Sequence, residues 1–114
     1  MAKTEMLENL LRGLKGEIVI SDENINIIYM NDAAIQNHEK RGGAKLIGKS
    51  LLDCHNAESK RKIKEMYAAF AAGDLRATQI RAVRGELARR SIMMPIMRDG
   101  RVKGCMELIV EEPL

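Results

Sequence analysis

The feature that most constrains the fold is an amphipathic segment at residues 57–72, which lies between two β-rich parts of the chain. Its apolar residues recur at the three- and four-residue spacing of one helix face, and charged residues occupy the opposite face. Asn56 provides a capping side chain before it, and Gly73 provides the residue type that commonly ends a helix. The apolar face consists of Ile63, Met66, Tyr67, Phe70 and Ala71. A helix with one apolar face must pack on a second layer, and the β-rich segments are the candidates for that layer.

Five strands are predicted around this helix. They are expected at residues 17–21, 25–30, 76–84, 86–97 and 101–110, separated by polar or glycine-containing turns. Side chains alternate along the last strand, so that one face carries Val102, Gly104, Met106, Leu108 and Val110, and the other carries Lys103, Cys105 and Glu107. An α+β fold, with a five-stranded antiparallel sheet and helices on one face, accommodates this order. We expect a pocket between the helices and the sheet, lined by the apolar side of the strands.

The chain opens on a second amphipathic helix, predicted at residues 4–14. A stripe along it consists of Leu7, Leu10, Leu11 and Leu14. Such a stripe has to be buried, either on the chain's own sheet or against the matching helix of a second copy. We therefore divide the chain into residues 1–15, a helix expected to contact a second copy, and residues 16–114, the folded domain. Acidic residues within the helix argue against a signal peptide.

The bulk composition limits the classes of function. A chain of 114 residues is the size of one domain. The formal net charge is +3, and no aromatic side chain interrupts the basic residues at 60–64, so we expect a solvated helix face and no nucleic-acid interface. Two cysteines without a C-x-x-C spacing provide neither a disulfide framework nor a four-ligand zinc site, and they fit a reduced, cytoplasmic protein. No apolar run approaches the roughly 18 residues of a membrane span.

Three segments, taken in order, resemble the landmarks of the PAS sensory domain family. They are IVISDENINIIYMNDAA at residues 18–34, LIGKSLLD at 46–53 and SIMMPIMRDGRVKGCMELIVEE at 91–112. The resemblance covers nearly the whole chain, although no single motif in it is specific. It implies a sheet order of 2-1-5-4-3, a ligand-binding or signalling role, frequent pairing through the N-terminal helix, and no catalysis by this domain alone.

The resemblance also raises the question of an output partner. Members of this family usually feed a kinase or another output module, and none follows in the sequence, which ends at Leu114. We therefore expect either a separate output protein, such as a kinase or a transcription regulator, or a longer protein of which this chain is one domain. The function expected is that of a small sensory domain that pairs with itself, binds a small molecule, and contacts neither nucleic acid nor membrane.

The candidate ligand site is predicted from the middle helices and the last two strands. Its side chains are His55, Met66, Tyr67, Phe70, Met94 and Met106. Flexible and polarizable methionines adapt well to ligands, although they also fill ordinary cores. An alternative is therefore a pocket filled by Met and Leu, in a domain that serves only for dimerisation or docking.

His55 is the candidate metal ligand, as an axial ligand to haem. The resemblance implies this role, since haem-binding members of the family hold iron with a histidine of the middle helices, and Met–His ligation of haem is known. The alternative is structural, with Cys54 packed beneath the helix and His55 helping Asn56 to cap it. Flavin photochemistry is not expected, because light-sensing members carry an Asn-Cys-Arg segment, whereas Cys54 is followed by His and Asn.

Other chemically reactive residues carry weaker signals. His38 is expected to be exposed in a polar stretch, and Cys105 is expected to be a partly exposed, inert thiol in the polar phase of the last strand. Residues 43–50 match the spacing of a phosphate-binding loop, but no apolar strand leads into them and no long helix follows directly, so nucleotide binding is not expected. The motifs of nucleophilic and metal-dependent enzymes are lacking, and the apolar strand faces place no acid in the pocket. Because both the catalytic motifs and an acid in the pocket are missing from this prediction, we expect no enzyme activity.

Overall fold

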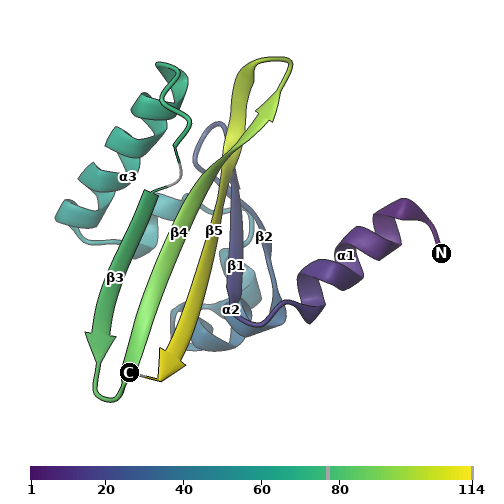
Figure 1. Ribbon diagram of the computed structural model, residues 1–114, viewed down its shortest axis with the longest axis vertical. Helices are drawn as coiled ribbons and strands as arrows, with labels where there is room; N and C mark the ends of the chain where they lie inside the picture. The colour runs from purple at the N-terminus through teal and green to yellow at the C-terminus, as the bar shows by residue number, and fades with distance from the viewer. Residues whose placement is uncertain (77, 114) are drawn as a thin grey trace.

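The computed structural model describes residues 1–76 and 78–113 of the chain, without the side chains of residues 54, 78–80 and 84. Its helices and strands follow one another in the predicted order (Figure 1). The helices are α1 (Lys3–Gly13), α2 (Asp32–Asn37) and α3 (Ala57–Ala71), with short 3-10 turns at Glu39–Arg41, Gly43–Leu46 and Leu51–Cys54. The strands are β1 (Glu17–Asp22), β2 (Ile27–Met30), β3 (Thr78–Arg84), β4 (Leu87–Arg98) and β5 (Arg101–Pro113).

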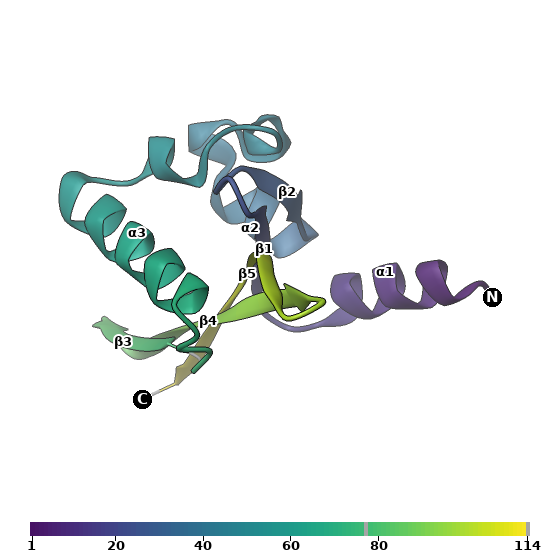
Figure 2. The ribbon, with the colours of Figure 1, turned by 90° about the horizontal axis from the view of Figure 1, so that it is seen from above.

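One antiparallel sheet contains the five strands in the order β2-β1-β5-β4-β3. The predicted order 2-1-5-4-3 and the α+β class are therefore confirmed. The first and last strands are neighbours within the sheet, and the chain crosses from the β2 edge to the β3 edge through the helical segment between them. This segment covers one face of the sheet, and α1 extends away from it (Figure 2). In the part of the chain that the structure describes, the other face has no helical layer.

Two asparagines begin the helices α2 and α3, and Asn56 does so as predicted. Asn56 accepts a hydrogen bond at 2.9 Å from a backbone N–H in the first turn of α3, at an exposed position. Asn31 accepts one at 3.0 Å from the Ala34 N–H and another at 2.9 Å from the Ile18 N–H. It also donates one at 2.8 Å to the Gly16 carbonyl. Asn31 is only 2 % exposed, so one buried side chain fixes α2 to the start of β1.

The core between α3 and the sheet forms as the helix periodicity predicts. Its buried side chains are Ile63, Met66, Tyr67, Phe70, Met93 and Cys105. The Tyr67 hydroxyl donates a hydrogen bond at 3.0 Å to the Asp22 carbonyl and lies 2.5 Å from the Ser21 hydroxyl. Burial raises the pKa of Tyr67 to about 12. The hydrogen bonds of Tyr67 fix the position of α3 on the central strands.

The predicted phase of β5 is wrong. Cys105 is only 3 % exposed and belongs to the core beneath α3, and Glu107 faces the helices two residues further along. Because side chains alternate along a strand, Met106 and its cross-strand neighbour Met94 lie on the opposite face. Alternation in the sequence predicts that a strand has two faces but not which one the helices cover. Here Met106, Leu108 and Val110 of the more apolar set face away from the helices, whereas Val102, beyond a shift in register between β4 and β5, packs against the core beneath α3.

The N-terminal helix α1 forms as predicted, but none of its residues is buried. Leu7, Leu10 and Leu14 are 52 %, 59 % and 42 % exposed. An isolated helix of 11 residues is marginally stable in water, so its apolar stripe needs a surface to pack on. Among the described residues, no helix is both long enough and apolar enough to cross a membrane.

Candidate functional site

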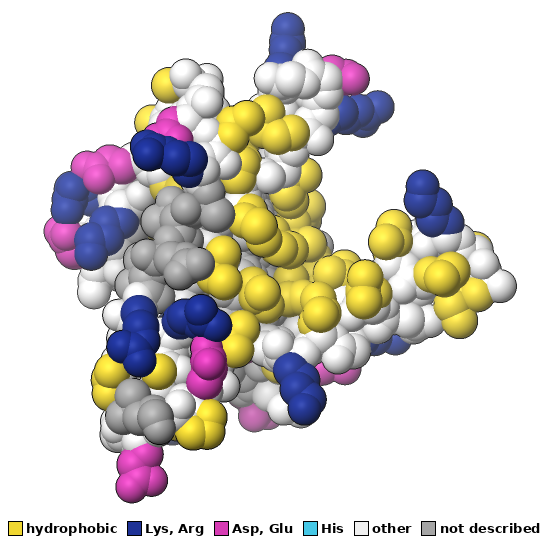
Figure 3. Space-filling model, viewed as in Figure 1, with side chains coloured by type: hydrophobic (Ala, Val, Ile, Leu, Met, Phe, Trp, Pro, Cys, Tyr) yellow, Lys and Arg dark blue, Asp and Glu magenta, His cyan; other side chains and the backbone are white. Residues whose placement is uncertain are grey.

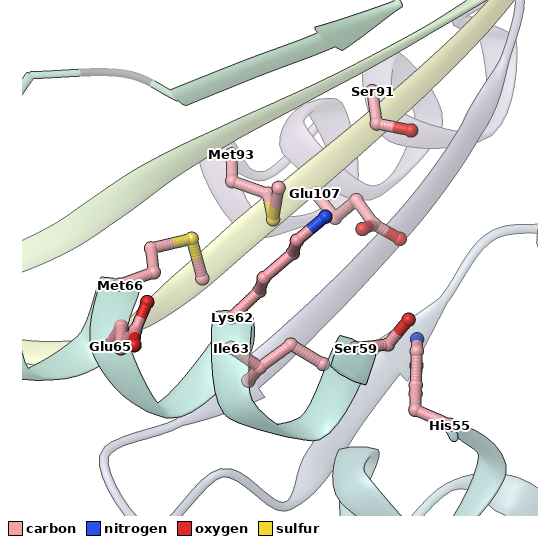
Figure 4. Close-up of a pocket in the computed structure, with 9 residues that line it drawn as sticks. All are labelled: His55, Ser59, Lys62, Ile63, Glu65, Met66, Ser91, Met93 and Glu107. Atoms are coloured by element: carbon pink, nitrogen blue, oxygen red, sulfur yellow. The ribbon is translucent and has the colours of Figure 1, made fainter. Parts of the chain in front are cut away.

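A cavity of about 580 Å³ lies between α3 and the strands β4 and β5, where the sequence predicts a pocket. Its wall comes from the first half of α3, from these two strands and from the turn before α3 (Figure 4). The apolar side chains of the wall are Ile63, Met66 and Met93, and the polar ones are His55, Ser59, Lys62, Glu65, Ser91 and Glu107. A cavity of this volume and mixed chemistry is typical of sites that hold small molecules.

The two methionines and three of the polar side chains lie on opposite sides of the cavity, while Glu65 lies beside Met66. In Figure 4 the sulfur atoms of Met66 and Met93 lie toward the left of the cavity. The side chains of Ser91, Ser59 and His55 lie toward its right. A molecule that fills this space would therefore combine an apolar body with a polar group.

Glu107 projects from the sheet into the cavity. It lies on β5, between Val19 of β1 and Met93 of β4. Burial raises the pKa of its carboxyl group above the ordinary value, and the positive charges that His55 and Arg89 can carry oppose that rise. Among the residues that the structure describes, its carboxylate has no hydrogen bond or ion pair. The expectation of a pocket without an acid is therefore wrong, because it rested on the wrong phase of β5.

His55 lines the cavity from the turn that precedes α3. Its Nδ1 donates a hydrogen bond to the carbonyl oxygen of Leu51, at 2.7 Å. A bond of this kind fixes the orientation of an imidazole and the nitrogen that carries its proton. The alternative role predicted for Cys54, a thiol packed beneath the helix, concerns a side chain that lies outside the described residues.

The other predicted site residues divide between the cavity, the core and the far face of the sheet. Met66 lines the cavity, whereas Tyr67 and Phe70 are buried in the adjoining core and do not belong to the wall. Met94 and Met106 pair with each other on the opposite face. The structure thus brings His55 and Met66 to one cavity and separates them from the two strand methionines.

Sequence reasoning missed most of the polar wall, including Ser59, Ser91 and Glu107. One signal could have found the last of these. Cysteine is among the residue types most often buried, so Cys105 was the better marker of the inward face of β5. Turning Cys105 inward also turns Glu107 inward, because the two lie two positions apart on the strand.

A second buried acid, Glu17, lies on the same face of the sheet and is fully partnered. It is 8 % exposed, accepts hydrogen bonds at 3.1 Å from the Asn37 side chain, and pairs with Arg89 at 3.4 Å. The Nδ1 of His38 lies 3.6 Å from the Glu17 carboxylate and donates a hydrogen bond to a backbone carbonyl. His38 is thus largely buried, and the prediction of an exposed side chain is wrong. Glu17 and His38 both influence the pKa of Glu107, so the two acids share one electrostatic environment.

The described residues contain no group of three or more His, Cys, Asp or Glu side chains that could hold a metal ion. A haem iron can be held by a single histidine. The role predicted for His55 as a haem ligand therefore stays a prediction, now with the side chain located in the wall of the cavity.

Comparison with known proteins decides the family. The family model described as PAS domain matches residues 7–111. This chain belongs to the PAS domain family. This match confirms the resemblance noted in the sequence. PAS domains are typically found in sensory and signalling proteins. No curated protein matches the chain.

Solved structures with the same fold share little sequence with this PAS domain. A C-terminal domain from Streptococcus mutans is similar with a TM-score of 0.79 and 18 % identity, over 96 % of this chain and 85 % of that chain. A sensory box sensor histidine kinase from Vibrio cholerae has a TM-score of 0.65 and 16 % identity, over 97 % of this chain and 92 % of that chain. The VqmA dimer from Vibrio cholerae has a TM-score of 0.64 and 15 % identity, over 98 % of this chain and 52 % of that chain. Likeness at this level of identity establishes the fold alone.

The cavity gives this PAS domain a defined binding chemistry. Its wall offers a carboxylate, an imidazole, an ammonium group and two hydroxyl groups beside an apolar surface. Such a set can orient a small polar molecule by hydrogen bonds while the apolar part excludes water. The residues that would do so come from α3 on one side and from the two longest strands on the other, so a ligand would contact both layers of the domain.

Proposed function

We propose that this PAS domain is a sensory module that binds a small molecule in the cavity between α3 and the strands β4 and β5. Binding is passed on to a second copy of the chain or to an output protein, such as a kinase or a transcription regulator, and the domain itself carries out no catalysis. The cavity supports this proposal most strongly, because its apolar wall with a few convergent polar groups is typical of ligand sites. A cytoplasmic setting is part of the proposal, since Cys105 is a free, buried thiol.

Native mass spectrometry of the purified chain tests ligand binding. We expect one small molecule per chain, either retained during purification or added from a metabolite extract. Ser91→Phe fills the cavity from β4 and is expected to abolish this adduct. Ala82→Phe, at an exposed position of β3, is the matched control and should keep it. Circular dichroism checks that both variants fold. An adduct that is equally strong in the two variants would contradict the proposal.

The uncovered face of the sheet supports pairing with a second copy. Figure 3 views this face and shows a band of hydrophobic side chains that runs from the strands onto α1. Leu7 and Leu10 of α1 and Ile96 of β4 are among the exposed apolar residues. Apolar patches of this kind mark interaction sites, and two copies related by a two-fold axis would offer each other the same helix stripe and sheet face. VqmA, which has the same fold, is a dimer, and this supports pairing. In the arrangement proposed for this chain, residues 1–15 form the contact.

A ligand-free dimerisation or docking module is the second candidate, and the same apolar face favours it. The two candidates differ in what the cavity contributes. If Ser91→Phe leaves pairing and partner capture unchanged and no adduct is ever found, the domain acts as a docking module. If a ligand alters pairing, the sensory function stands.

A haem-based gas or redox sensor is a further candidate, favoured by the position of His55 in the cavity wall and by the hydrogen bond that orients its ring. Protein expressed with added iron would show a Soret absorption band. The band should be lost in His55→Ala and kept in the control His38→Ala. A spectrum without such a band removes this candidate.

A further inference from the structure

We propose that the ligand of this PAS domain carries a protonated amine, which pairs with Glu107 inside the cavity, and an apolar body, which packs on Met66 and Met93. The inference rests on the proposed function, because it names the chemical class of the molecule that the cavity holds. It is carried by the charges around Glu107, by the exposure of the rim residues and by the donors and acceptors of the wall.

Glu107 is an acid that faces the cavity. The structure gives its carboxylate neither a hydrogen bond nor an ion pair among the described residues. Removing a carboxylate from water is costly unless a cation or hydrogen-bond donors replace the lost water. A cationic group that enters the cavity would supply both the charge and the donors.

The charged groups that face Glu107 leave a place for one cation. Glu17 of β1 is paired with Arg89 of β4. The rings of His38, beside α2, and His55, before α3, each donate Nδ1–H to a backbone carbonyl. Two carboxylates, Glu17 and Glu107, therefore face one guanidinium, that of Arg89, and among the described residues its ion pair is with Glu17.

The charged residues at the rim do not fill this place. Lys62 extends from α3 toward Glu107 in Figure 4, but no ion pair joins the two among the described residues. The Lys62 side chain is 58 % exposed, and its Nζ lies 4.0 Å from Glu58 on the same helix. The Glu65 side chain is 62 % exposed and pairs with Arg61. Both side chains are thus more than half exposed and have ion-pair partners on α3, whereas Glu107 projects from the sheet into the cavity.

The rest of the wall fits a primary alkylammonium ion. Such an ion has three N–H donors, and the wall provides acceptors in the Glu107 carboxylate and in the hydroxyl groups of Ser59 and Ser91. The alkyl part can pack on Met66 and Met93, whose thioethers adapt to its shape. An anionic ligand would bring a like charge to Glu107, and a neutral alcohol would leave its charge uncompensated.

Three probes with the same six-carbon chain test the inference: hexylamine, hexan-1-ol and hexanoate. Each is titrated into the full chain, and the shifts of backbone amide resonances from the cavity wall give its affinity. We expect hexylamine to bind about tenfold more tightly than hexan-1-ol, as for a hydrogen bond to a charged group, and hexanoate to bind most weakly. Glu107→Gln should remove the advantage of the amine. The control Glu23→Gln makes the same change at an exposed residue outside the cavity wall and should preserve it.

The affinity for hexylamine should also depend on pH. The amine pairs with the ionised carboxylate, so its affinity should increase as the pH rises through the raised pKa of Glu107 and become constant above it. Binding of hexan-1-ol should show no such increase, and in Glu107→Gln the two probes should behave alike.

The outcomes separate this inference from the function on which it rests. Equal affinities for the three probes at the same cavity resonances would overturn the inference and leave small-molecule binding in place. An amine preference that persists in Glu107→Gln would overturn it as well. If none of the probes shifts a cavity resonance at its highest soluble concentration, both the inference and the proposed ligand-binding function fail.

Discussion

The two faces of the sheet have opposite chemistry. The face beneath the helices carries, beside its apolar core, a group of buried or half-buried charged residues that includes Glu17, Arg89 and Glu107. The face without helices carries a broad apolar band (Figure 3). In a sheet with one solvated face, the covered side is normally apolar and the solvated side polar. The reversal indicates that both faces are incomplete in an isolated chain. Among the described residues, the inner face has an acid without an ion pair, and the outer face has apolar side chains without a covering layer.

The faces also differ in how their contacts are specified. The inner face depends on hydrogen bonds in fixed directions, such as those of Asn31 and Tyr67. The outer face offers a broad apolar surface, which gains free energy from burial whatever the detailed orientation. Changes on the inner face should therefore alter the free energy of unfolding of one chain, and changes on the outer face should alter association.

The largest effect is expected from Asn31→Ala. This change leaves the buried Ile18 N–H without its acceptor and the Gly16 carbonyl without its donor, and it removes the cap of α2. Unpaired buried polar groups cost about 1–3 kcal/mol each, so we expect a loss of about 3 kcal/mol in the free energy of unfolding, measured by urea denaturation. The exposed cap Asn56 is the control, and Asn56→Ala should cost about 1 kcal/mol. Equal losses would contradict the view that directed contacts beneath the helices hold the fold.

The second-largest effect is expected from a change on the outer face. It should weaken the association of two chains without changing the stability of one chain. Leu10→Glu places a charge in the exposed stripe of α1, where it would be buried on pairing. Burial of one leucine contributes about 2 kcal/mol, so we expect the dissociation constant of the dimer to rise about 30-fold, measured by analytical ultracentrifugation. The unfolding of the monomer should change by no more than about 0.5 kcal/mol.

Leu75→Glu is the matched control for this prediction, because Leu75 is 45 % exposed and lies between α3 and β3, outside α1. It should leave the dissociation constant unchanged. If the two substitutions weaken association equally, or if the wild-type chain is monomeric at all concentrations, the outer face has a different partner.

The third effect is the pH dependence caused by Glu107. Its pKa is raised in the folded chain above the ordinary value of 4.5, so the folded state binds more protons than the unfolded state between the two values. Stability must therefore fall as the pH rises from 4.5 through the raised pKa and then become constant. Glu107→Gln removes this fall, and it should make the ligand-free domain more stable than the wild type at neutral pH. In the matched control, the exposed Glu65→Gln, the fall caused by Glu107 should remain; urea midpoints measured across the pH range provide the comparison.

The elements of the fold could be predicted because each has a local cause in the sequence. The spacing of Ile63, Met66 and Phe70 predicts the helix, and the side chain of Asn56 predicts where it begins. The strand order did not follow from these local signals and came from the resemblance to the PAS family. Local periodicity reports how a segment folds, whereas the order of strands depends on contacts between distant segments.

The site was only partly predictable, for a reason that the two faces make clear. The sequence of β5 has an apolar set containing Met106 and a polar set containing Glu107, and the usual rule turns the apolar set toward the helices. That rule fails when the outer face is itself apolar, as it is here. His55 and Met66 were placed near the cavity correctly because they belong to the helical segment, whose position does not depend on the phase of a strand.

The smallest effect is expected at Cys105, and it tests the assignment of the two faces directly. Burial raises the pKa of this thiol to about 12, so almost no thiolate is present at neutral pH. In a Cys54→Ser background, folded protein should react with iodoacetamide far more slowly than urea-unfolded protein, as measured by mass spectrometry. If the folded chain were alkylated as fast as the unfolded one, Cys105 would have to face away from the helices. Glu107 lies on the same face of the strand, so it would then lie outside the cavity. The proposed preference for an amine, which depends on the charge of Glu107, would lose its basis.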